Sequence, residues 1–142
     1  GDMLKTALAV LVGITLARAA GLDQDLTVAV AGVAALVGHN YPVFLRFQGG
    51  KGLACAALLG FYFAPALVGV WMLAFLVTVA LTRLMVLGQM AAMVAVPIVS
   101  FFAFPQAAIP SCFVCALVLL RHAPRIKNVL DGTEPKMYYK IR

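Results

Sequence analysis

A glycine-rich segment with one lysine is the part of this chain most typical of a chemical site. Residues 38–52 read GHNYPVFLRFQGGKG and stand directly before a very apolar stretch. Glycine lets successive backbone amides turn toward an anion, and Lys51 adds a point charge. A helix beginning at Leu53 would add its first amides and the positive end of its dipole. The segment predicts a metal-free phosphate site, although a tight turn with Lys51 as an interfacial anchor also fits it.

The nucleotide-binding P-loop does not fit this segment. That motif has a glycine five residues before the glycine that precedes its lysine, and a Ser or Thr after the lysine. Leu45 and Gly52 occupy those two positions here. Gly52 has no hydroxyl to offer a magnesium ion, so the sequence does not predict an NTPase.

Two histidines accompany the glycine-rich segment. His39 lies within it, and His122 stands at the end of the last apolar stretch. Each can position a hydroxyl or take a proton, but a single histidine at an interface is also often a structural cap. Arg46 is a further cation of the segment and a candidate for binding phosphate.

The composition indicates a membrane protein. Of 142 residues, 64% are hydrophobic and 11% are charged, whereas soluble domains have roughly half and a quarter. So small a globule could not hide this much apolar surface from water. The basic residues that give the net charge of +6 lie between and after apolar stretches. This placement does not indicate nucleic-acid binding, but it suits binding of anionic lipid or a phosphorylated substrate.

The three cysteines predict neither disulfides nor a metal site. Cys112 and Cys115 would share one helix face, but they lie in apolar surroundings without His or Asp partners. Packing is the better interpretation of these thiols, and of Cys55.

The apolar stretches predict an all-α membrane protein of about five to six helices in one domain, residues 1–142. The uncharged run 53–81 exceeds what one span needs, and Pro65 suggests a break between two hinged helices. A basic tail, 121–142, follows the last helix. The expected helices are 4–20, 26–37 with an extension toward Tyr41, 53–63, 66–82, 84–104 and 106–120.

The basic residues predict how the chain crosses the membrane. If the hinged pair leaves and re-enters on one side, ten basic residues share that side and only Arg18 lies opposite. Because positive charge marks the cytoplasmic side, segment 38–52 and the tail are expected there. The ten are Lys5, Arg46, Lys51, Arg83, Arg121, Arg125, Lys127, Lys136, Lys140 and Arg142.

Segment 38–52, with Leu53 and Ala54, resembles the GHxxPxFLxFxGGKGxA motif of the bacterial acyl-phosphate:glycerol-3-phosphate acyltransferases, integral membrane enzymes of phospholipid synthesis. Asp2 and Lys5 resemble that family's GDxxKG segment, and residues 122–134 resemble its tail pattern ending in GTE. The resemblance starts after the family's first helix and first motif, so we expect part of that active site outside residues 1–142.

Five positions depart from the family's pattern. Thr6 stands where the GDxxKG segment ends in glycine, and Val86 and Gln89 stand at serine positions. In the tail, Arg125 stands where the family has asparagine, and Asn128 takes a usually basic position.

The resemblance implies transfer of a fatty acyl group from acyl phosphate to the 1-hydroxyl of glycerol 3-phosphate, giving lysophosphatidate, at the cytoplasmic face of the inner (plasma) membrane. It implies no cofactor, because acyl phosphate is already activated. The expected catalytic residues are His39, Lys51 and His122; the phosphate-binding residues are Gly49, Gly50, Lys51, Gly52 and Arg46; and Asp2, Lys5 and Glu134 are supporting residues.

Two other classes of function remain open at this stage. An anion-binding transporter segment would use a similar glycine loop, but it predicts polar residues along the helices, and the apolar stretches carry few. A structural membrane subunit would need only the basic tail, and it leaves the glycine loop unexplained.

Overall fold

The computed structural model describes residues 2–45 and 49–137, and over these residues the chain is helical without strands. The predicted all-α fold is therefore confirmed. The helices in chain order are α1 (Asp2–Ala20), α2 (Gln24–Asn40), the 3₁₀ helix η1 (Val43–Leu45), α3 (Leu53–Phe63), α4 (Pro65–Thr82), α5 (Met85–Ala103), α6 (Pro105–His122) and α7 (Pro124–Leu130).

Within the described residues, α1, α4, α5 and α6 are long and apolar enough to cross a membrane. The 17 residues of α2 and the 11 of α3 make shorter apolar helices. Large apolar side chains also cover the outside of the bundle, among them Leu73, Leu81, Phe101 and Phe102. Since lipid rather than water can solvate such a surface, the bundle suits a bilayer.

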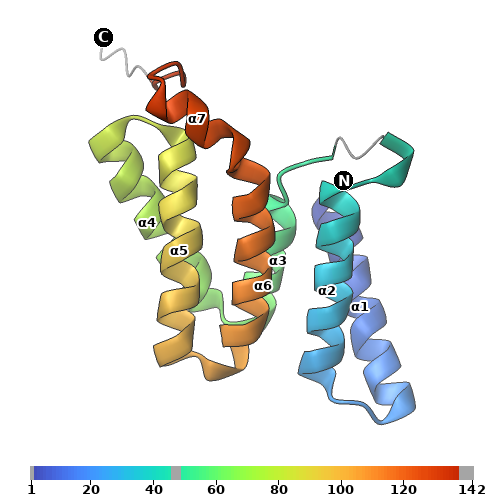
Figure 1. Ribbon diagram of the computed structural model, residues 1–142. Coiled ribbons are helices and arrows are strands. Elements are labelled where there is room, and N and C mark those ends of the chain that lie inside the picture. Colours follow the sequence, from blue (N-terminus) through green and yellow to red (C-terminus); the bar gives the residue numbers. More distant parts are fainter. Residues whose placement is uncertain (1, 46–48, 138–142) are drawn as a thin grey trace.

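The predicted break at Pro65 is present. Ala64 is extended, with φ −161° and ψ 99°, and Pro65 opens α4 at its first helical position. Proline is favoured there because its fixed φ suits the helix and its missing N–H needs no acceptor. Helix α3 therefore ends inside the bundle and α4 returns beside it (Figure 1).

This return brings segments far apart in the sequence to one end of the bundle. The loop before α3, the turn between α4 and α5, and α7 all lie at the end of the bundle where α1 begins and α6 ends (Figure 1). Met137 donates its backbone N–H to the carbonyl of Arg83 at 2.9 Å, which ties the tail to that turn. The re-entrant path expected from the charges is thus the path that the chain takes.

Close helix contacts hold the bundle together. Gly13 lets α1 approach α2, because a Cβ there would lie 3.2 Å from the Cα of Val28. Helices α5 and α6 are joined by the hydroxyls of Ser100 and Ser111, which lie 2.6 Å apart.

Two local expectations change. Helix α2 begins at Gln24 rather than at residue 26, because Asp23 caps it by accepting the N–H of Leu26 at 2.7 Å, which places Asp25 in the first helical turn. The tail was expected only to be basic, yet it contains α7. After this helix, the amides of Thr133 and Glu134 donate to the carbonyl of Asn128.

Candidate functional site

The glycine loop, residues 49–52, lies across the end of α2 and is bound by α6. Gly50 donates its N–H to the carbonyl of His39 at 3.2 Å. From α6, Arg121 donates from Nε to the carbonyl of Gly50 at 3.2 Å and from Nη2 to that of Gly49 at 3.1 Å. Two contacts from different helices therefore fix the direction of consecutive peptide groups.

This direction determines which amides remain for a ligand. The N–H of Gly50 is used by His39, so it is not a donor to an anion in this conformation. Because a trans peptide directs its C=O and the next N–H to opposite sides, the N–H of Lys51 points away from Arg121. The first hydrogen bond at the start of α3 joins Ala56 N to Gly52 O, so the amides of Leu53 to Cys55 precede it.

Gly52 at the N-cap position of α3 has no side chain that could cap the helix. The donors available for an anion are therefore those from Lys51 onward rather than the glycine amides as a group.

The glycines are required by space as well as by conformation. A side chain at Gly49 would meet the carbonyls of His39 and Asn40, and one at Gly50 would overlap the imidazole of His39. Gly52 has φ +77°, a left-handed conformation that disfavours other residues, and a Cβ there would overlap Leu36. The loop is thus packed directly onto α2.

The expected residues of the loop come together around this packing. His39, half-buried, lies with its ring against Gly50, while Lys51 is exposed at the start of α3. His122 is buried at the end of α6 and its Nδ1 lies 2.9 Å from the carbonyl of Val118, one turn earlier. A bond within its own helix is the arrangement expected of a structural histidine, so His39 is the better placed of the two.

The supporting residues lie in other positions. Glu134, buried, forms an ion pair with Arg125 of α7, with Oε1 and Nη2 3.0 Å apart. Lys5 is exposed on α1. Arg46 and the side chain of Asp2 lie outside the described residues.

Sequence reasoning did not identify Arg121 and Asn40 as site residues. Arg121 binds the loop carbonyls, and its guanidinium also lies 5.1 Å from the ring centre of Tyr41, a cation–π distance. Asn40 is completely buried beside Gly52. In the sequence, Arg121 is only an arginine beside His122, and Asn40 is only a polar residue at the end of an apolar helix. Neither pattern indicates a site without the fold.

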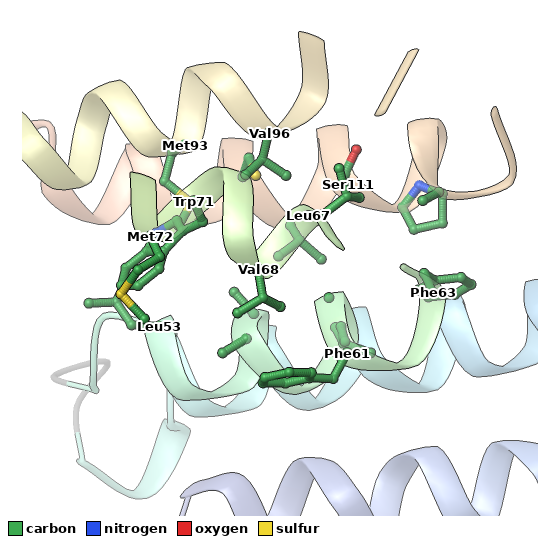
Figure 2. A pocket seen from close by; sticks show the side chains of 18 residues that line it. Leu53, Phe61, Phe63, Leu67, Val68, Trp71, Met72, Met93, Val96 and Ser111 are labelled. Carbon is green, nitrogen blue, oxygen red and sulfur yellow. The ribbon is translucent and has the colours of Figure 1, made fainter. Parts of the chain in front are cut away.

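An apolar pocket of about 270 Å³ begins beside the loop. In Figure 2, Leu53 and Phe61 of α3 lie on one side and Met93 and Val96 of α5 on the other, with side chains of α4 between them. Leu53 directly follows Gly52, so one helix start adjoins both the loop and the pocket. The lining residues are Leu53, Ala56, Ala57, Leu59, Gly60, Phe61, Phe63, Leu67, Val68, Trp71, Met72, Met93, Val96, Ala107, Pro110, Ser111, Val114 and Cys115.

The cysteines pack as expected in two of three cases. Cys55 and Cys115 are buried, Cys112 is exposed, and all three are free thiols. Over the described ranges, no group of three or more His, Cys, Asp or Glu side chains lies close enough to hold a metal ion.

The bundle and its apolar exterior define a multi-pass membrane protein. A model of the family described as glycerol-3-phosphate acyltransferase matches residues 1–132, and the chain belongs to this family. A glycerol-3-phosphate acyltransferase of Pseudomonas putida (strain GB-1) is 40% identical over 141 residues, which cover 94% of this chain and 68% of that protein. One of Roseobacter denitrificans is 42% identical over 132 residues, with 91% of this chain and 64% of that protein covered.

The fold also matches a solved structure. The crystal structure of PlsY, an integral membrane glycerol 3-phosphate acyltransferase, in its glycerol 3-phosphate form has a TM-score of 0.78 and 25% identity, covering 96% of this chain and 69% of PlsY. Its lysophosphatidic acid form matches with the same TM-score. The chain thus spans about two thirds of the length of these relatives, and the expected membrane acyltransferase family of phospholipid synthesis is confirmed. The matches favour it over a transporter segment or a structural subunit.

Proposed function

We propose that this chain carries the phosphate-binding and acyl-binding parts of a site that transfers a fatty acyl group from acyl phosphate to glycerol 3-phosphate. The 1-hydroxyl oxygen of glycerol 3-phosphate attacks the acyl carbon, and the bond between that carbon and the phosphate oxygen breaks. The products are lysophosphatidate and inorganic phosphate. The hydroxyl proton passes to a base or to the departing phosphate, so the step needs no oxidant and no covalent enzyme intermediate.

The observation that carries this proposal is the junction at the start of α3. Amides and a lysine suited to phosphate stand at Lys51 and Gly52, and the apolar pocket begins at the next residue, Leu53. An acyl phosphate has the same order, a charged head joined directly to a hydrocarbon chain. One substrate molecule can therefore occupy both features at once.

Each loop residue has a role in this proposal. Lys51, together with the amides that follow it, stabilises charge on a phosphate. Gly49, Gly50 and Gly52 allow the loop to pack on the end of α2, which fixes where those amides lie. Arg46 is proposed as a further phosphate contact.

The proton requires a second group. His39 is the proposed base or hydroxyl partner, because its imidazole lies against Gly50 beside the loop. His122 is proposed to support the end of α6, next to Arg121. Phosphate itself is an alternative base, since it leaves with a negative charge.

The supporting residues act through their neighbours. Glu134 holds Arg125 in a 3.0 Å ion pair, and Asp2 and Lys5 are proposed to play a comparable part at the start of α1. We further propose that the protein lies in the inner membrane with this loop facing the cytoplasm, from which water-soluble glycerol 3-phosphate would reach it. The excess of basic residues at this end of the bundle supports that orientation.

A direct assay tests the reaction. Full-length protein purified in detergent is incubated with palmitoyl phosphate and glycerol 3-phosphate, and lysophosphatidate and inorganic phosphate are measured. We expect equal amounts of both products. Phosphate release without lysophosphatidate, or no turnover with this donor, would contradict the proposal.

The pocket predicts a dependence on acyl-chain length. Ala57→Phe adds a ring to the pocket wall, so kcat/KM for a sixteen-carbon donor should fall by about tenfold or more, while an eight-carbon donor should be affected less. The matched control is Leu73→Phe, because Leu73 is exposed on α4 outside the pocket. Equal losses with both donors would argue against the pocket as the acyl site.

A further inference from the structure

Asn40, the last residue of α2, has a buried side chain that lacks hydrogen-bond partners. Its exposed fraction is 0%. Neither Oδ1 nor Nδ2 has a hydrogen-bond partner among residues 2–45 and 49–137. A buried amide that leaves both its donor and its acceptor unpaired is unfavourable, and native proteins rarely keep one without a reason.

The position of this side chain suggests the reason. A Cβ built on Gly52 would lie 2.8 Å from Oδ1 and 3.3 Å from Nδ2 of Asn40, so the amide lies directly against the residue that opens α3. Leu36, one turn earlier on α2, is apolar and also contacts the Cβ position of this glycine. The polar neighbourhood of Asn40 is therefore the start of α3.

The start of α3 itself lacks a cap. Gly52, the residue at the N-cap position, has no side chain to accept the first amides of the helix. The amides of Leu53 to Cys55 precede the first helical hydrogen bond. A helix start with unpaired N–H groups binds anions, and here the amide of Asn40 lies next to such a start.

Three carbonyls of this region each accept a hydrogen bond from another group. Those of Gly49 and Gly50 accept from Arg121, and that of His39 accepts from the N–H of Gly50. This leaves the amide of Asn40 without a described backbone acceptor for its N–H groups, although a phosphoryl oxygen at the α3 start would provide one.

We propose that Asn40 is a further binding residue of this site, whose Nδ2 donates to a phosphoryl oxygen held at the start of α3. The inference rests on the proposed phosphate site and adds a residue to it. Gly52 covers the amide in the present conformation, so a small shift of the glycine loop accompanies binding. The phosphoryl group belongs to glycerol 3-phosphate or to acyl phosphate, and kinetics separate these two sources.

The test compares Asn40→Leu, which removes the amide at similar size, with Asn40→Asp, which places a carboxylate against the anion. KM is measured for each substrate separately in full-length protein. The unfolding midpoint is measured with and without about 10 mM glycerol 3-phosphate or inorganic phosphate, a concentration that would shift the midpoint for affinities on the order of millimolar. We expect Asn40→Leu to raise KM for the substrate whose phosphate it binds by about tenfold or more, with a smaller change in kcat.

Asn40→Asp should raise the same KM further, and both variants should lose most of the midpoint shift produced by that ligand. The aspartate variant keeps the size and polarity of the site, so it serves if the leucine variant fails to fold. Gln106→Leu, an exposed amide at the start of α6, is the control and should retain the wild-type shift and both KM values.

A purely structural Asn40 predicts a different result. Removing an unpaired buried amide should then raise the unfolding midpoint without ligand and leave both KM values and the ligand-induced shift unchanged, which would overturn the inference. A wild-type protein without turnover or phosphate-induced shift would overturn the proposed function along with it. Normal wild-type behaviour with normal Asn40 variants would overturn this inference alone.

Discussion

Lys51→Ala is expected to abolish acyl transfer while leaving the fold and membrane insertion intact. Lys51 is exposed at the start of α3, so its removal leaves no cavity and no unpaired buried charge. What it removes is a full positive charge beside amides that carry only partial charges. Because charge on phosphate grows as the acyl bond breaks, the loss should fall mainly on kcat, by about a hundredfold or more.

The measurement is initial rate against both substrates in full-length protein, with the unfolding midpoint as a check on the fold. Lys136→Ala is the matched control, because Lys136 is an exposed lysine that follows Glu134 in the tail. It makes the same change in net charge, so it separates a local effect of Lys51 from a general loss of positive potential. Near-normal turnover of Lys51→Ala would remove the phosphate-binding assignment of the loop.

The helices were largely predictable because hydrophobicity, proline and charge agreed. The uncharged run over 53–81 was too long for one span, Pro65 suggested where it breaks, and the positive charges required a return to the same side. The structure has this break, with α3 ending at Phe63 and α4 beginning at Pro65. Proline inside a helix was less informative, since α5 continues through Pro97 and α6 through Pro110.

The site was predictable only where its residues are adjacent in the sequence. The glycine loop and His39 stand close together along the chain, and the motif identified them. The contacts between Arg121 and the loop join residues 71 and 72 positions apart, and neither residue type nor spacing indicates such a pairing. Asn40, proposed above as a further contact, was not a candidate for another reason, because a single polar residue at a helix end has no distinctive pattern.

His122 and Arg121 are neighbours in the sequence, but their contacts in the structure differ. The position of His122 at the exit of the last apolar stretch made it a candidate alongside His39. In the structure its Nδ1 lies 2.9 Å from a carbonyl of its own helix, and its side chain is buried. The neighbouring Arg121, which had no expected role beyond its charge, is the α6 residue that contacts the loop.

Arg121→Lys is expected to lower activity by about ten- to a hundredfold although the charge is kept. A guanidinium donates in a fixed fork, which here bonds the carbonyls of two successive residues, Gly49 and Gly50. A lysine ammonium is a point charge and cannot reproduce both directions together with the contact to the Tyr41 ring. The peptide groups would then be free to turn, and the amides that follow would no longer be held in one direction.

The same loss of order gives Arg121→Lys a distinctive signature. Since the charge is unchanged, electrostatic attraction of the substrates should persist, and the fall should appear in kcat more than in KM. Arg18→Lys is the matched control, because Arg18 is an exposed arginine in the last turn of α1. Wild-type kinetics for Arg121→Lys would mean that positive charge alone suffices at this position and that the carbonyl contacts do not organise the loop. Full loss of activity with a lowered unfolding midpoint would instead assign Arg121 to the packing of α6 against α2.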